Sequence, residues 1–227
     1  MVTAGKVFRL RKETELRQIS RRLENFKKGE VFERDGHELD LRSEISSCNL
    51  SKQGLSGVFA EDVVLNVNQH GRLIFVPKTR RVPFLFSSHG NRTLLAILEK
   101  KPVANSVANR FNKLLKIEDV EIVEGRIRPE ALRRFHESNP EGTKIVFFED
   151  IGVPNVEKLS LYGSNLANTS LYNDYCARGR MWYVVVTSKK YGNIVGITGD
   201  GVVTIFNKIE EKDYFSYVTE EIFPLIT

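Results

Sequence analysis

The chain has little cysteine, methionine and tryptophan and no long hydrophobic run. Its 227 residues include two cysteines, two methionines and one tryptophan. Two cysteines, Cys48 and Cys176, are too few for a disulfide scaffold. No apolar run approaches the ~20 residues that a membrane-spanning helix needs, and the first residues lack the apolar core of a signal peptide. We therefore expect a soluble, cytoplasmic protein that has no membrane partner.

The sequence also lacks the spacings that mark common metal and nucleophile sites. Its four histidines form no HxxxH or HExxH pattern, and CxxC and GxSxG are absent. No neighbour in the sequence would lower the pKa of the Cys176 thiol, so this residue is interpreted as a small apolar core residue. We expect no metal ion and no cofactor.

Apolar periodicity predicts an α+β fold, with mostly antiparallel sheets and flanking helices. Helices are predicted at 12–28, 102–116, 129–138, 171–178 and 210–223. Strands are predicted at 31–34, 63–67, 73–76, 82–86, 120–127, 144–148, 181–186, 193–198 and 202–206, and 94–98 fits either element. A turn is predicted at 77–81, and the segments 43–60 and 151–168 are predicted as loops because they are rich in turn-forming residues.

A pattern of strands followed by a helix occurs twice, over 63–116 and again over 181–223. This pattern predicts two similar strand-meander-plus-helix halves, a basic one at 1–117 and an acidic one at 118–227. A single α+β domain is the alternative. Three glycines within 196–201 could suggest a phosphate-binding loop, but such a loop needs a following helix. A strand pattern follows instead, so Gly199-Asp200-Gly201 is predicted as a hairpin turn.

Positive charge is concentrated in two blocks of the chain. The net charge is +5, but residues 1–28 carry nine basic and three acidic side chains, and residues 73–116 carry nine basic side chains and one acidic one. Residues 29–72 and 117–227 are net acidic. Clustered positive charge raises the local potential and attracts polyanions.

The basic blocks predict a DNA- or RNA-binding protein whose basic surface contacts the phosphate backbone. The predicted contacts are Lys78, Arg80, Arg81, Arg92, Lys100, Lys101, Arg110, Lys113 and Lys116, with Arg17 and Arg21 from the first helix. Phe84 and Phe86 lie nearby but are predicted to fill the core.

Two other function classes stay open. Glu149 and Asp150 close an apolar strand and, with Asp200, are the candidate catalytic residues of a metal-dependent nuclease. Successive strand residues point to opposite faces, so Glu149 and Asp150 converge only if the strand bends there. The acidic and basic blocks of two copies could also pair, which predicts a protein-interaction module or a homo-oligomer.

Overall fold

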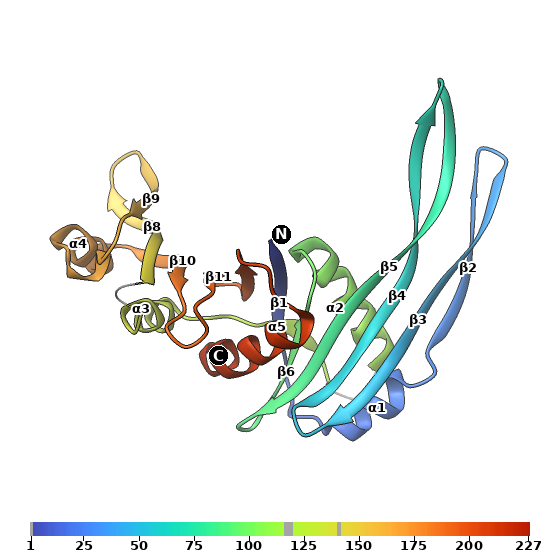
Figure 1. Ribbon diagram of the computed structural model, residues 1–227, viewed down its shortest axis with the longest axis horizontal. Coiled ribbons are helices and arrows are strands. Elements are labelled where there is room, and N and C mark those ends of the chain that lie inside the picture. Colours follow the sequence, from blue (N-terminus) through green and yellow to red (C-terminus); the bar gives the residue numbers. More distant parts are fainter. Residues whose placement is uncertain (1, 116–119, 140–141) are drawn as a thin grey trace.

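The computed structural model describes residues 2–115, 120–139 and 142–227 and shows an α+β fold. The strands of these residues form one 12-stranded sheet in the order β2-β3-β4-β5-β6-β1-β12-β11-β10-β8-β9, and β7 pairs with β1 (Figure 1). All of the strand pairs are antiparallel.

The strands are β1 (Thr3–Leu10), β2 (Lys27–Arg34), β3 (His37–Ser51), β4 (Gly54–Gln69), β5 (Arg72–His89), β6 (Arg92–Ile97), β7 (Ile122–Glu124), β8 (Thr143–Val153), β9 (Val156–Tyr162), β10 (Arg180–Thr187), β11 (Ile194–Thr198) and β12 (Val202–Ile205). The helices are α1 (Leu16–Leu23), α2 (Lys101–Leu115), α3 (Pro129–Glu137), α4 (Ser170–Arg178) and α5 (Glu211–Tyr217). A 3-10 turn covers Leu166–Asn168, and α5 continues through a π turn (Val218–Ile222) and a 3-10 turn (Phe223–Leu225).

The first strand, β1, lies in the middle of the sheet, between β6 and β12, and connects the strands on its two sides. Residues 6–9 of β1 pair with β6, and residues 3–6 pair with β12. The second half of β1 also pairs with β7. Because these partners come from distant parts of the sequence, β1 makes the sheet continuous across the chain.

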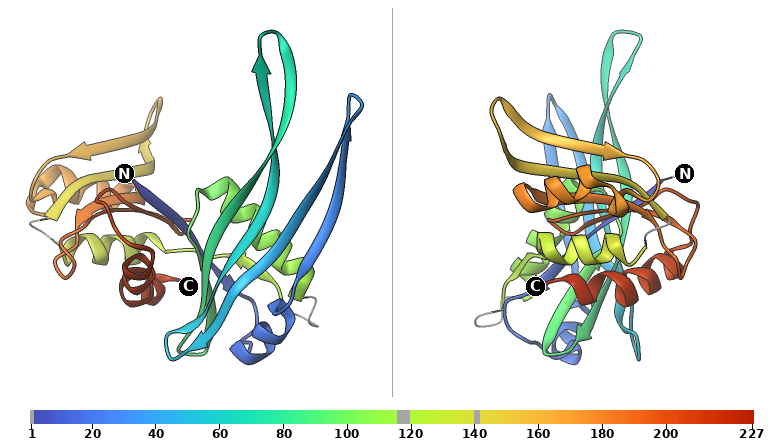
Figure 2. Two further views of the ribbon diagram at one scale, coloured as in Figure 1. Left: turned by 45° about the vertical axis from the view of Figure 1, so that its right-hand side comes forward. Right: turned by 90° about the vertical axis from the view of Figure 1, so that its left-hand side faces the viewer.

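Side chains alternate between two apolar cores, one on each face of the sheet, as strand geometry requires. On β1, Val7 packs into the core that contains α3, α4 and α5, whereas Phe8 packs into the core that contains α1 and α2. On β6, Leu94 packs into the core with α3, α4 and α5, and Leu95 packs into the core with α1 and α2. We call the two sides the α5 face and the α2 face. Figure 2 shows α3 and α5 together on one side of the C-terminal strands.

Two long hairpins, β2–β3 and β4–β5, project beyond the helices (Figures 1 and 2). Their distal parts are joined by Phe75 of β5, whose ring centre lies 5.7 Å from that of Phe32 and 5.4 Å from that of His37. The turn of β2–β3 falls at Asp35-Gly36, as the sequence predicts, and both residues have positive φ.

The structure confirms most of the predicted helices and strands. It corrects the two predicted loops and the predicted turn at 77–81, and only Ile122–Glu124 (β7) of the strand predicted at 120–127 is a strand. Residues 43–60 are not a loop but belong to β3 and β4, and residues 151–168 contain the end of β8 and all of β9. The predicted turn at 77–81 lies inside β5, which runs unbroken from Arg72 to His89. Residues 94–97 of the ambiguous segment 94–98 belong to strand β6, the first helix is shorter than predicted, and Gly199-Asp200-Gly201 forms the predicted turn.

None of the helices in the described residues combines the length and the apolar character needed to cross a lipid bilayer.

Candidate nucleic-acid interface

One buried carboxylate holds two of the predicted basic residues. Arg80 of β5 lies directly opposite Glu61 of β4, and Arg110 reaches the same carboxylate from α2. Arg110 Nη2 lies 2.9 Å from Glu61 Oε2, and Arg80 Nε lies 3.6 Å from Glu61 Oε1. The Glu61 side chain is only 5% exposed. Its charge offsets part of the positive potential that Arg80 and Arg110 would otherwise present.

Arg81 and Arg92 are separated from this group. Arg81 follows Arg80 on the same strand and therefore lies on the α5 face. Burial raises the pKa of Glu211 at the start of α5, and the positive charge of Arg81 opposes that rise. Arg92 donates from Nη1 to the backbone carbonyl of Ile226. The predicted basic block is thus divided between the two faces of the sheet.

Lys101, the first residue of α2, contacts Asp200, which lies in the turn between β11 and β12. Lys101 Nζ is 2.5 Å from Asp200 Oδ2, and the Thr198 hydroxyl also donates to Asp200. The hydrogen bond to Asp200 raises the pKa of Lys101. Burial alone would raise the pKa of Asp200, but the hydrogen bonds from Lys101 and Thr198 outweigh it and lower that pKa. The Asp200 carboxylate is therefore already paired with a cation of the protein itself, Lys101.

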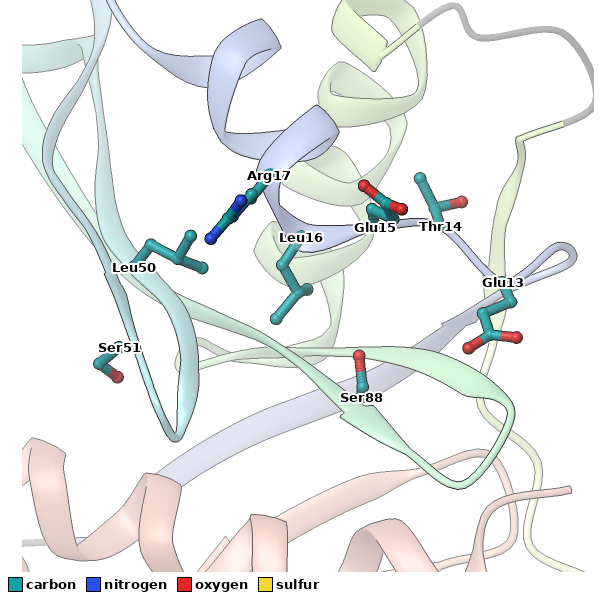
Figure 3. Close-up of a pocket in the computed structure, with 8 residues that line it drawn as sticks. All are labelled: Glu13, Thr14, Glu15, Leu16, Arg17, Leu50, Ser51 and Ser88. Carbon is teal, nitrogen blue, oxygen red and sulfur yellow. The ribbon is translucent and has the colours of Figure 1, made fainter.

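The other predicted basic residues of the described chain are exposed: Lys78, Lys100, Lys113, Arg17 and Arg21. Lys116 lies outside the described residues. Arg17 points toward Leu50 across a shallow hollow of about 730 Å³ that Glu13 and Glu15 also line (Figure 3). Two carboxylates beside one guanidinium do not favour a polyanion there.

Glu149 and Asp150 do converge, but on a guanidinium group. A bulge follows Glu149 in β8, and Asp150 has a positive φ of 54°. Both carboxylates thereby reach Arg180, whose Nη2 lies 2.8 Å from Glu149 Oε1 and 3.1 Å from Asp150 Oδ2. Within the described ranges, no group of three or more His, Cys, Asp or Glu side chains could hold a metal ion.

The structure reveals an aromatic cluster that the sequence did not predict as a site. It consists of Phe147 of β8, Tyr162 of β9, and Trp182 and Tyr183 of β10. We call these four residues the aromatic platform. The ring centre of Phe147 lies 5.3 Å from that of Tyr183, 5.5 Å from that of Trp182 and 6.3 Å from that of Tyr162. All four side chains retain exposure, and Tyr162 is 65% exposed.

Strand register explains why these rings meet. Phe147 pairs with Tyr183 across β8 and β10, and a bulge between Met181 and Tyr183 inserts Trp182 beside them. The neighbouring residues Phe148 and Val184 point to the opposite side, into the core with α3, α4 and α5. The platform therefore lies on the α2 face of the sheet, and these three helices do not cover it.

Charged side chains border the platform. Lys158 of β9, Glu149 of β8 and Arg180 of β10 are successive cross-strand partners and form a row beside the aromatic rings. The Lys158 ammonium lies 5.0 Å from the centre of the Trp182 ring. Burial raises the pKa of the Tyr183 phenol, which keeps that ring neutral. An uncharged aromatic surface can stack a planar ring, and Lys158 is the rim cation that could meet a negatively charged group, because Arg180 is paired with Glu149 and Asp150.

A sequence signal for the platform exists in two adjacent aromatic pairs, Phe147-Phe148 and Trp182-Tyr183. Because neighbouring strand residues face opposite sides, only one ring of a pair in a regular strand can enter the core on the α5 face, and the other lies on the opposite face.

Comparison with known proteins assigns no relationship, since no protein-family model and no curated protein sequence matches this chain.

Proposed function

We propose that this protein binds single-stranded nucleic acid on the aromatic platform. The observation that carries the proposal is the group of four partly exposed rings, supplied by three adjacent strands, on a sheet face that α3, α4 and α5 leave uncovered. Bases stack on such rings with little dependence on sequence, because every base has a π face. Lys158, at the rim, supplies a positive charge for the phosphate backbone, whereas Arg180 is paired with Glu149 and Asp150.

A single strand fits this surface better than a duplex. Bases in a duplex already stack on one another, whereas unpaired bases can be splayed onto aromatic side chains. The platform rings come from the sheet itself rather than from a helix that could enter a groove.

The exposed cations of the basic N-terminal half enter the proposal as a second contact. Lys100 and Lys113 are both exposed on α2 or immediately before it, and α2 packs on the face of the sheet that carries the platform. In this proposal, a bound strand contacts the platform with its bases and these two lysines with its backbone.

Fluorescence anisotropy tests the proposal with labelled single-stranded DNA, single-stranded RNA and a duplex of the same sequence, at about 50 mM and about 200 mM salt. We expect both single strands to bind more tightly than the duplex and to weaken with salt. Tyr162→Ala should weaken binding at least about fivefold, since each stacked base contributes about 1–3 kcal/mol. The matched control Phe32→Ala, on the β2–β3 hairpin, should leave binding unchanged.

Two outcomes would contradict the proposal. Equal affinity of Tyr162→Ala and the unmodified protein would place the ligand elsewhere. If no oligonucleotide binds but the protein self-associates, and Tyr162→Ala abolishes that association, the platform is a protein interface instead. A Lys100→Glu/Lys113→Glu variant separately measures the contribution of the basic half.

A further inference from the structure

A cavity lined by arginine adjoins the aromatic platform. It has a volume of about 360 Å³, and Trp182 lines it as well as belonging to the platform. Arg126, Arg128 and Arg180 supply its positive charge, and Glu149 is its only acidic side chain among the described residues. A cavity of this size accommodates a small polar group together with part of a nucleotide.

Backbone geometry directs Arg126 and Arg128 to the same side. Ile127, between them, is 3% exposed and packs into the core on the α5 face. The two arginines flank this inward residue on an extended segment, so both point outward. The segment is fixed by hydrogen bonds from the Ile127 amide to the Gly199 carbonyl (2.8 Å) and from the Thr227 amide to the Arg126 carbonyl (2.9 Å).

The guanidinium groups of Arg126 and Arg128 have no ion-pair partner in the part of the chain that the structure describes. Arg180, by contrast, is already paired with Glu149 and Asp150. Two guanidinium groups without ion-pair partners that line one cavity suit a phosphate, since each planar fork can donate two parallel hydrogen bonds to its oxygens.

We propose that this cavity binds the terminal phosphate of a single strand whose adjacent bases lie on the platform. This inference rests on the proposed function. A terminal phosphate carries close to two negative charges, whereas an internal phosphate carries one, so two unpaired arginines fit the terminal group better. The shared wall at Trp182 places the phosphate site at one end of the stacking surface.

The experiment compares oligonucleotides of about ten nucleotides that carry a hydroxyl group at both ends, a 5′ phosphate or a 3′ phosphate. We expect one phosphorylated form to bind roughly tenfold more tightly than the hydroxyl form. An Arg126→Ala/Arg128→Ala variant should lose this preference and still bind the hydroxyl form. The control Arg133→Ala/Arg134→Ala removes two arginines of α3 outside the cavity and should keep the preference.

Three other results would contradict either the terminal-phosphate site or the proposed function. Equal affinities for all three forms would overturn the terminal-phosphate site and leave platform binding intact. If Arg126→Ala/Arg128→Ala weakens the hydroxyl and phosphorylated forms by the same factor, the arginines contact internal phosphates and the inference fails. Binding of none of the oligonucleotides at low salt would overturn the proposed function itself.

Discussion

The ammonium group of Lys158 lies 5.0 Å from the centre of the Trp182 ring. Lys158 is on β9 and Trp182 is on β10, so the contact spans the intervening strand β8. It places a flexible cation over the aromatic platform. Under the proposed function, this cation meets the backbone of a strand whose bases stack on the platform.

Replacing Lys158 tests this arrangement through the salt dependence of binding. Each phosphate that a protein neutralises on a single strand adds about 0.7 to the slope of log affinity against log salt. Lys158→Gln should reduce the slope by about 0.7. Lys212→Gln, an equal charge change on α5, should leave it unchanged, and an equal fall in both variants would show a general charge effect rather than a local contact.

Gly196 tests the platform without removing an aromatic residue. A Cβ atom at this position would lie 2.5 Å from the Tyr183 hydroxyl, so Gly196→Ala must displace the Tyr183 ring. We expect affinity for single strands to fall about threefold to tenfold, part of the stacking energy of one base. Gly29→Ala is the control, because no atom lies within 4 Å of its added Cβ. Normal binding by Gly196→Ala would show that the position of Tyr183 does not matter.

The buried lysine of β1 gives a prediction on stability. Lys6 is fully buried, and its ammonium group lies 2.5 Å from Glu124 and 3.0 Å from the Asn105 side-chain oxygen. Glu124→Gln would leave a buried positive charge without its counter-charge. We expect the free energy of unfolding to fall by about 1–3 kcal/mol, less than for a fully buried pair because Glu124 is partly exposed.

Glu121→Gln is the matched control for that measurement. Glu121 pairs with Arg11 where both side chains are at least half exposed, so its loss should cost less than about 1 kcal/mol. Urea denaturation of both variants measures the difference. Equal losses would show that the Lys6–Glu124 pair stabilises no more than a surface ion pair.

The burial of His136 leads to a prediction of how the free energy of unfolding depends on pH. Its side chain is fully buried and stacks on Tyr172, and burial lowers its pKa to about 4. The unfolded chain binds this proton near pH 6.5, so the stability that the neutral ring provides is complete above that pH and is lost as the pH falls toward 4. At pH 5 the loss relative to pH 8 should be about 2 kcal/mol.

The measurement compares urea unfolding of the unmodified protein and His136→Phe across this pH range. Between pH 5 and pH 8, the free energy of unfolding of the unmodified protein should rise by about 2 kcal/mol more than that of His136→Phe. A difference that is constant with pH would contradict a neutral His136 in the folded state.

Local sequence patterns predicted the helices and most of the strands. They missed the strand residues within 43–60, where glycines are required by close packing. The segment 43–60 looks like a loop because it is rich in serine and glycine. In the structure, a Cβ on Gly57 would lie 2.6 Å from the Phe84 ring, and Gly54 has a φ of 140° against the Phe86 carbonyl. Both positions of this strand are occupied by glycine because a neighbouring group approaches too closely for a side chain, the Phe84 ring at Gly57 and the Phe86 carbonyl at Gly54. No local sequence pattern reveals these contacts.

The candidate site depended still more on long-range pairing. The platform joins residue 147 to residues 162, 182 and 183, and only the register of β8, β9 and β10 brings them together. The basic block failed to form one face for a similar reason, since β4 places Glu61 opposite Arg80. Charge along the sequence did not predict which cations would remain unpaired.

Trp182 provides the most direct test, because it is the only tryptophan of the chain and belongs to the platform. Titration with an unlabelled single strand should change Trp182 emission with the same midpoint as the anisotropy measurement, since stacking alters the surroundings of the indole. Tight binding with unchanged Trp182 emission would place the strand away from the platform and contradict the account.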